Sequence, residues 1–271
     1  AISLASGTDS VTFDGGDFSG VTSFDGGSGN NDSLTLRNTV ATVTGADIST
    51  KVIGMENLTF GSGITVTGNI VQGAEDNSLT FDGADFSGVT SFDGGAGTDS
   101  LTFSNVTGSL AGATVTGIET VTIESGASVN LHGTLQTGTL VVENGGTLSA
   151  GNSPGLLNIV GNLDLGVSST TLVELAGLTP GVEVGGHDVI DVSAGIATLL
   201  AGATIDIDFF AGFMAGLGDS FDVLVADDII GDLNTLNFDF TRALLGSGFA
   251  WSTELFTYTG GANAGRETLR L

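Results

Sequence analysis

Apolar and polar residues alternate in short stretches that return at a nearly constant interval over the first 125 residues. Each stretch is a triplet whose outer residues are apolar and whose middle residue is threonine, the period-two pattern of a strand with one buried face. The triplets begin 23, 24, 21, 22 and 20 positions apart, which predicts one coil per interval. They are Val11-Thr12-Phe13, Leu34-Thr35-Leu36, Leu58-Thr59-Phe60, Leu79-Thr80-Phe81, Leu101-Thr102-Phe103 and Val121-Thr122-Ile123.

A longer repeat contains these coils. Residues 11–27 read VTFDGGDFSGVTSFDGG, and residues 79–95, 68 positions later, read LTFDGADFSGVTSFDGG. Three coils make up one such unit, so the short and long periods coexist. Self-similarity at a fixed period is the sequence signature of repeat architectures.

These periods predict an all-β protein, a right-handed parallel β-helix (solenoid) in which each strand pairs with the coils before and after it. We expect Leu34, Leu58, Leu79 and Leu101 to stack in register. A second strand is predicted at Val21 to Phe24, Ile64 to Val66 and Val89 to Phe92, with Gly, Asp, Asn and Ser at the corners. The alternative, an antiparallel sandwich, gives no reason for one motif to return in register.

Three regions follow one another without a linker. Residues 1–125 form the repeat array, residues 126–200 continue the β-helix with a looser pattern, and residues 201–271 form an aromatic-rich β segment. We expect this last segment to cap the helix or to serve in assembly. Its aromatic residues are Phe209, Phe210, Phe213, Phe221, Phe238, Phe240, Phe249, Trp251, Phe256 and Tyr258.

The chain has 31 acidic residues against five basic ones, a net charge of −26. This charge disfavours nucleic acid and anionic lipid surfaces as partners, and predicts that bound cations stabilise the fold. Cysteine is absent, which excludes disulfides. The most apolar stretch, residues 196–218, contains Asp206 and Asp208, so we expect no membrane insertion. Strand-like sequence begins almost at Ala1, which we interpret as a mature secreted product, extracellular or at the cell surface.

One resemblance concerns the second half of the chain. GTLSAGNSPG at residues 146–155 is followed by LLNIVGNLDL, VELAG, HDVIDVSAG and GDSFDVLVAD. Over about residues 129–260 this pattern resembles the passenger region of autotransporter-type bacterial surface proteins. The resemblance implies a right-handed parallel β-helix with a role in adhesion or surface architecture.

A second resemblance concerns the corners. GGAGTDSLT at residues 94–102 is similar to the calcium-binding nonapeptide repeats of RTX proteins, and GGSGNNDSLT at residues 26–35 matches with one insertion. It implies Ca²⁺ shared by aspartates and loop carbonyls of neighbouring turns, and we expect Asp99 in a loop facing solvent or a cation. The candidate metal residues are Asp25, Asp32, Asp93, Asp99, Gly94, Gly95 and Gly97, with Asp14 and Asp82 at the other corner. Alternatively, Asp and Gly simply fit tight turns.

The chemistry of the chain does not favour an enzyme. Polysaccharide lyases need basic residues, and the five here are scattered. Hydrolases need converging carboxylates, and the nearest candidates, Asp227 with Asp228 and Asp206 with Asp208, have no companion motif. His132 and His187 have no spaced partner for a transition metal and are expected at the surface or at a corner.

We therefore predict an extracellular structural protein that associates with itself into fibres, a surface layer or a biofilm matrix. The alternative is an adhesin or carbohydrate-binding passenger fragment whose partner is a surface polysaccharide, and a polysaccharide-degrading enzyme comes third. For assembly, we expect Glu267 to Leu271 to form an alternating strand that adds to the open edge of a neighbouring subunit. The amino-terminal residues enter the first strand without a capping helix.

Overall fold

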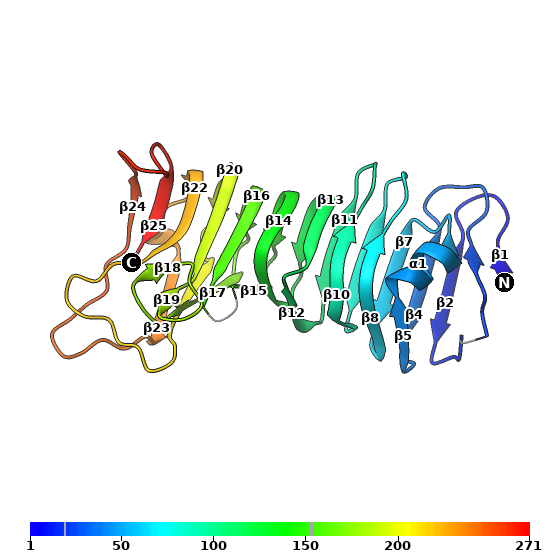
Figure 1. Cartoon of the computed structure of the whole chain (residues 1–271), viewed down its shortest axis with the longest axis horizontal. Coiled ribbons are helices and arrows are strands. Elements are labelled where there is room, and N and C mark those ends of the chain that lie inside the picture. The colour runs from blue at the N-terminus through cyan, green and yellow to red at the C-terminus, as the bar shows by residue number, and fades with distance from the viewer. Residues whose placement is uncertain (19, 152–153) are drawn as a thin grey trace.

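The computed structural model describes residues 1–18, 20–151 and 154–271. The protein is nearly all β and elongated, with strands lying side by side along the long axis in sequence order and the two termini at opposite ends (Figure 1). No helix among the described residues is long and apolar enough to cross a membrane. The length of the molecule is therefore built by adding one strand to the next.

One row of parallel strands runs from the first repeat almost to the end of the chain. Each strand pairs in parallel with the one before and the one after it. The row consists of β2 (Ser10–Asp14), β4 (Ser33–Arg37), β7 (Asn57–Gly61), β9 (Ser78–Asp82), β11 (Ser100–Ser104), β13 (Thr114–Ile123), β14 (Ser128–Val142), β16 (Leu156–Leu165), β20 (Val189–Leu199) and β22 (Asp222–Ile230).

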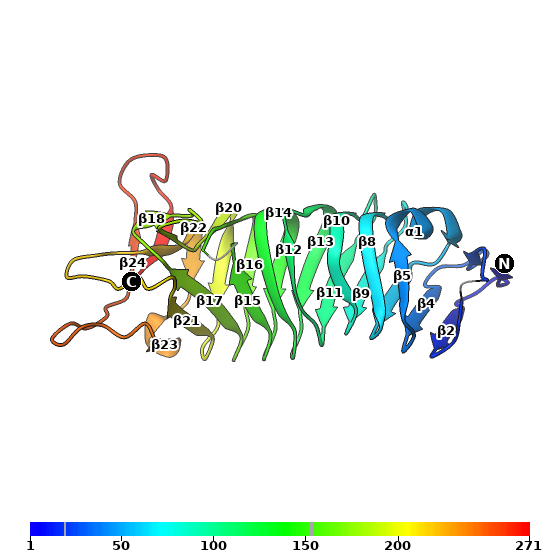
Figure 2. The ribbon, with the colours of Figure 1, turned by 60° about the horizontal axis from the view of Figure 1, so that its bottom comes forward.

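Shorter rows of strands lie beside this long row (Figure 2). They come from the segments between its successive strands, and each strand of the long row with the segment that follows it is called a coil below. One contains β5 (Ala41–Thr44), β8 (Ile64–Val71) and β10 (Asp85–Asp93), which lead into β13. Another contains β12 (Thr107–Ala111), β15 (Thr147–Ala150), β17 (Thr170–Leu175), β21 (Thr204–Phe209) and β23 (Asn237–Arg242), together with part of β14. Three two-residue strands, β1 (Ile2–Ser3), β3 (Phe24–Asp25) and β6 (Val52–Ile53), form a small sheet, and β18 (Thr179–Pro180) pairs with β19 (Gly186–His187).

The register confirms the predicted ladder. Leu34 lies opposite Leu58, Leu58 opposite Leu79, and Leu79 opposite Leu101. All four leucines are buried, and the third residue of each triplet stacks in the same way, as in the Phe81 and Phe103 rings 5.8 Å apart. The intervening threonines point to the outer face. Because each buried aliphatic or aromatic side chain contributes about 1.5–3 kcal/mol, this inward ladder is the main stabilising element of the fold.

The first copy of the predicted second strand is an exception. The strand expected at Val21 to Phe24 is wrong for most of its length, because only Phe24 and Asp25 pair, as β3. Its counterparts, Ile64 to Val66 and Val89 to Phe92, lie within β8 and β10 as predicted.

Among the residues that the structure describes, one α-helix, α1 (Gly45–Lys51), interrupts the β pattern, and the sequence analysis did not predict it. Thr44 and Asp47 form a capping box at its start, and Lys51 pairs with Asp47 one turn earlier at 2.7 Å. Ile48 anchors the helix in the core. The local signal was the Thr-x-x-Asp spacing, which satisfies the free N–H groups of a first helical turn.

In the carboxy-terminal segment, β23 still continues a parallel row, but the last strand runs in the opposite direction to β22. A 3-10 turn, η1 (Leu233–Thr235), precedes β23, and the chain then returns as β24 (Glu254–Thr257) and β25 (Glu267–Arg270). Strand β25 pairs antiparallel with β22 and with β24 of its own chain, and Leu269 and Leu271 are buried. The expectation that Glu267 to Leu271 is free to add to a neighbouring subunit is therefore wrong for this conformation.

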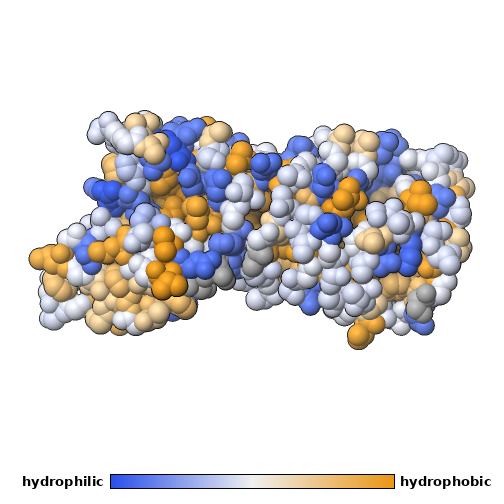
Figure 3. All heavy atoms as spheres, in the orientation of Figure 1, coloured by the Kyte–Doolittle hydropathy of each residue, from blue (hydrophilic) through white to orange (hydrophobic). Residues whose placement is uncertain are grey.

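The aromatic residues of this segment pack mostly against one another. The Trp251 ring stacks on Phe240 at 5.0 Å, and its Nε1–H donates to the Ala243 carbonyl at 2.9 Å. Beyond this cluster, two loops carry exposed apolar side chains at the end of the molecule that holds the C terminus (Figure 3). They include Met214, Leu217 and Leu244.

Replacing Leu79 by Ala removes a side chain that is 1% exposed and should lower the free energy of unfolding by about 2–5 kcal/mol. Leu79→Asp should abolish the cooperative transition, because an unpaired carboxylate would lie among apolar neighbours. Urea unfolding followed by circular dichroism measures both. The control is Thr80→Ala on the outer face of the same strand, expected to change stability by about 0.5 kcal/mol or less. An equal loss in the two alanine variants would contradict the ladder as the stabilising element.

Candidate metal centre at the aspartate corners

Two corners of the array repeat the same arrangement, one around Asp32 and the other around Asp99. At each corner an Asp-Gly-Gly turn, which begins with Asp25 or Asp93, follows one strand. A second aspartate, Asp32 or Asp99, lies directly before the next strand. The first aspartate closes the turn, since Asp25 Oδ1 accepts from the Gly27 N–H at 3.0 Å and Asp93 Oδ1 accepts from the Gly95 N–H at 3.1 Å. Gly27 and Gly95 have φ of 89° and 90°, a conformation that favours glycine.

The second aspartate of each corner connects three coils. Asp32 Oδ1 accepts from the Asp9 N–H at 2.6 Å in the preceding coil, and the Asp32 N–H donates to Glu56 Oε2 at 2.8 Å in the following coil. The other corner repeats this geometry: Asp99 Oδ1 accepts from the Asn77 N–H at 2.7 Å, and the Asp99 N–H donates to Glu119 Oε2 at 2.6 Å. Carboxylates thus satisfy backbone donors at corners where strand pairing is interrupted.

Both of these aspartates are buried, which corrects the expectation that Asp99 faces solvent. Asp32 is 0% exposed and Asp99 is 1% exposed. Burial, the largest cause, raises the pKa of Asp99 above its ordinary value, against the opposing effect of the Asn77 N–H and with added repulsion from Glu119 and Asp76. The other carboxylate oxygen, Oδ2, is also buried and has no hydrogen-bond partner in either residue.

Glycines make room for these oxygens. A Cβ added at Gly26 would lie 2.6 Å from Asp32 Oδ2 and 1.9 Å from the Gly54 carbonyl oxygen, and one added at Gly94 would lie 2.8 Å from Asp99 Oδ2 and 2.0 Å from the Gly117 carbonyl oxygen. An unpaired carboxylate oxygen therefore lies near a backbone carbonyl at each corner. These are oxygen atoms of the kind that a hard cation binds.

The predicted calcium ligands are only partly brought together. Asp32 and Asp99 offer hard oxygen atoms of the kind that Ca²⁺ binds, and the glycine carbonyls add to them. Asp25 and Asp93 instead use an oxygen to hold their own turns, and Gly97 packs against the Glu75 carbonyl. Among the described residues, no group of three or more acidic or histidine side chains is placed to hold a metal. Each corner therefore supplies part of a coordination shell.

Glu56 and Glu119 are the corner residues that the sequence analysis missed. Each stands in a Gly-x-Glu sequence, Gly54-Met55-Glu56 or Gly117-Ile118-Glu119, and lies two residues before the first residue of a triplet. That spacing was a usable signal, because it recurs one coil after each nonapeptide-like motif.

The other carboxylates considered in the sequence analysis contact arginine or asparagine side chains. Asp206 and Asp208 both pair with Arg242, at 2.7 and 3.3 Å, and Asp227 pairs with Arg266 at 3.3 Å. Asp14 pairs with Arg37 at 2.9 Å, and Asp82 accepts from the Asn105 side chain. The Asp14, Asp82, Asp206 and Asp208 contacts join successive coils, whereas the Asp227 contact joins β22 to the antiparallel carboxy-terminal segment.

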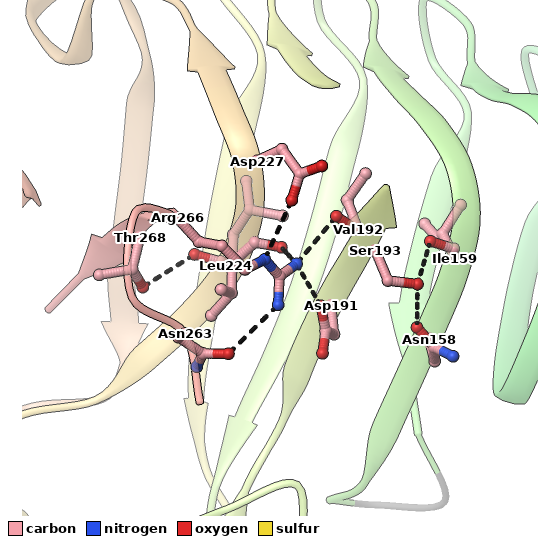
Figure 4. A network of polar contacts seen from close by, with 11 residues as sticks. Asn158, Ile159, Asp191, Val192, Ser193, Leu224, Asp227, Asn263, Arg266 and Thr268 are labelled. Atoms are coloured by element: carbon pink, nitrogen blue, oxygen red, sulfur yellow. Dashed lines mark hydrogen bonds and ion pairs between the residues drawn. The ribbon is translucent and has the colours of Figure 1, made fainter. Parts of the chain in front are cut away.

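The Arg266 guanidinium group connects the last strands of the stack (Figure 4). It donates to Asp191 at 2.5 Å, to the Val192 carbonyl at 2.9 Å and to the Val225 carbonyl at 3.3 Å, and its side chain is 16% exposed. It therefore attaches the reversed carboxy-terminal segment to two coils at once. Charged hydrogen bonds of this type are about twice as strong as neutral ones.

Two further buried polar residues, His187 and Asp188, lie next to each other in the sequence at the end of β19. His187, expected at the surface or a corner, is instead 1% exposed and packs edge-on against Phe221, and its burial lowers its pKa. The neighbouring Asp188 accepts from the N–H groups of Gly155 at 2.6 Å and Glu174 at 2.7 Å. Burial raises the pKa of Asp188 to about 7. His132 lies 3.9 Å from Glu183.

Comparison with known proteins adds no assignment, since no protein-family model and no curated protein matches this chain. Within the GNSPG motif that carries the likeness to autotransporter passengers, Asn152 and Ser153 lie outside the described residues. The corner geometry is consequently the main guide to the candidate site.

Replacing Gly94 by Ala should strongly destabilise the array, because its Cβ would collide with the Gly117 carbonyl and with Asp99. We expect a loss of about 2 kcal/mol or more in the free energy of unfolding, the cost typical of overpacking. The matched control is Gly73→Ala, where an added Cβ meets nothing within 4 Å. Thermal and urea unfolding of both variants measure the difference, and equal stability would show that the corner is not tightly packed.

The raised pKa of Asp188 predicts a distinctive dependence of stability on pH. The folded protein keeps this proton up to about pH 7, whereas the unfolded chain loses it near the ordinary value of 3.8. The contribution of this group to the free energy of unfolding therefore falls as pH rises from about 4 to 7. Asp188→Asn should lack this decrease. The free energy of unfolding of the wild type minus that of the variant, measured in urea titrations, should therefore fall as pH rises over that range. A difference that is constant between pH 4 and 7 would contradict the assignment.

Proposed function

We propose that this protein is an extracellular structural protein, a right-handed parallel β-helix that associates with copies of itself into fibres, a surface layer or a biofilm matrix. The support comes from the continuous, in-register parallel pairing of strands from β2 to β22. Stacked coils of this kind form stiff rods and need neither disulfides nor a catalytic centre. The likeness of residues 129–260 to autotransporter passengers is consistent with this role.

The observation that carries the proposal is the state of the amino-terminal edge. Strand β1 pairs only with β3, and β2 pairs only with β4, so within the described residues the other side of each has no strand. Val11 and Phe13 of β2 belong to the inward ladder but are only half-buried. An edge with unpaired backbone groups and partly exposed core residues is a template for strand addition.

Charge sets the conditions under which such rods can associate. All five basic residues already take part in ion pairs within the chain, with Asp14, Asp47, Asp206, Asp191 and Asp222 among their partners. The remaining acidic residues leave a large negative charge, which opposes contact between copies. Bound cations or high salt would reduce that repulsion.

Calcium is the cation we propose. The residues that would hold it are Asp32 and Asp99, whose Oδ2 atoms have no partner, together with the Gly54 and Gly117 carbonyls beside them. Bound there, the ion would supply the positive charge that two neighbouring acceptors lack. It would stabilise the corners without taking part in any reaction.

If calcium binds at these corners, the melting temperature should rise as calcium increases from micromolar to millimolar, since a ligand of the folded state stabilises it by mass action. Asp99→Asn should reduce the rise, whereas Asp228→Asn, an exposed aspartate distant in sequence from the corners, should not. Differential scanning calorimetry with a magnesium series as ionic control measures this. A melting temperature that does not change with calcium would remove the ion from the proposal.

Self-association through the amino-terminal edge should depend on Val11. Val11→Lys places a charge on the inward side of the edge strand, a change that natural proteins use to block strand addition, and should weaken association by about tenfold or more. Val40→Lys is the control, because Val40 is 97% exposed. Light scattering and negative-stain imaging over a concentration series give the readout. A full-length protein that stays monomeric at high concentration would refute self-association.

A further inference from the structure

The same nine residues adopt two different conformations in this protein. Residues 17–25 and 85–93 both read DFSGVTSFD. The second copy forms strand β10 over its whole length, from Asp85 to Asp93. In the first copy, leaving aside Ser19, which lies outside the described residues, only Phe24 and Asp25 are in a strand. Since the sequence is identical, the surroundings must cause the difference.

The difference lies in one neighbouring strand. Asp85, Gly88 and Val89 of β10 pair with Thr65, Thr67 and Gly68 of β8, whereas pairing with β13 begins only at Ser91. The first half of β10 is therefore held as a strand by β8. No strand among the described residues lies in the corresponding position beside residues 20–23.

Strand β1 fixes the register beside the first copy. Ile2 lies opposite Phe24 and Ser3 opposite Asp25, as Ile70 lies opposite Phe92 and Val71 opposite Asp93. These pairs are related by the 68-residue repeat. Beside the first copy, β1 thus occupies the place of the last two residues of β8, Ala1 corresponds to Asn69, and no described residue takes the place of Ile64 to Gly68.

Side-chain burial follows the same division. In the second copy Phe86 is 1% exposed and Val89 is 5% exposed, whereas their counterparts Phe18 and Val21 are only partly buried. On the side toward the next coil, an apolar cavity of about 130 Å³ lies between Phe18, Val21 and the residues around α1. The first copy is therefore less tightly packed than the second, although its side chains are the same.

We propose that β2, Phe18 and residues 20–23 form an acceptor surface for one further parallel β-coil of this chain's own repeat type. Its occupant has the features of residues 57–68: an apolar-Thr-apolar strand that pairs with β2, as β7 pairs with β9, followed by a strand that pairs with residues 20–23, as β8 pairs with β10. Residues 57–68 carry no charged side chain, which suits an edge that contains Asp9 and Asp14. The inference rests on the stacked-coil part of the proposed function and is independent of self-association.

The first test adds a synthetic peptide of residues 57–68 to the full-length protein and follows amide hydrogen exchange. Binding should slow exchange at residues 20–23 by about tenfold or more, toward the rate of the identical residues 88–91, which serve as an internal reference. A peptide carrying Leu58→Asp and Val66→Asp is the matched control, because it places carboxylates where the ladder needs apolar groups. It should give no protection.

The second test does not depend on the affinity of a short peptide. Because Ala1 corresponds to Asn69 in the repeat, a copy of residues 57–68 fused directly before Ala1 restores the register. The fusion should protect residues 20–23 and raise the melting temperature, while a fusion with the two aspartate substitutions should do neither. Protection by the peptide or by the fusion supports the acceptor surface.

The proposal is overturned if neither addition slows exchange at residues 20–23, or if these residues already exchange as slowly as residues 88–91 in the untreated protein. Light scattering separates this result from the proposed self-association. A protein that stays monomeric yet is protected by the peptide has the acceptor surface without self-association. A protein that associates without protection at residues 20–23 does so through another surface, and the acceptor proposal fails.

Discussion

The structure depends on parallel, in-register pairing of strands with similar sequences. This pairing places each residue beside its equivalent in the next coil, so one apolar position becomes a continuous apolar column. Leucine and phenylalanine profit from such stacking, because every side chain is covered above and below. The same geometry brings acidic residues together at the corners, where Glu119 and Asp76 repel Asp99. Part of this cost is offset because the Asp32 and Asp99 carboxylates each accept a hydrogen bond from a backbone N–H of the preceding coil.

The strands and their register could be predicted from the sequence because both arise from a pattern that repeats. The triplets indicated which side chains of each strand are buried and how far apart successive strands lie in the sequence. The near-identical copy 68 residues later indicated that the coils form a repeat array. The elements that could not be predicted occur once. Helix α1 stands where a strand segment would otherwise continue, and a local capping box stabilises its first turn. Strand β25 pairs antiparallel with β22, which lies well before it in the sequence, so no repeat indicates this pairing. A single event gives no periodic signal.

The candidate site was predictable in composition but not in geometry. The sequence identified Asp25, Asp32, Asp93 and Asp99 as corner residues, yet it could not distinguish the two that close a turn from the two that are buried. That distinction depends on which backbone donors lie in the neighbouring coils. Glu56 and Glu119 complete the corners from a coil further on, so their role becomes visible only when three coils are considered together.

The direction of the hydrogen bonds also determines how the rod would respond to force. Strands lie across the long axis, so the backbone bonds that join the coils run along it (Figure 1). Tension applied to the two ends would therefore separate coils one after another, and each step would break only the bonds of a single interface. At the carboxy-terminal end Arg266 joins two coils and the reversed strand through one side chain. Under load these last coils would therefore separate together as one unit.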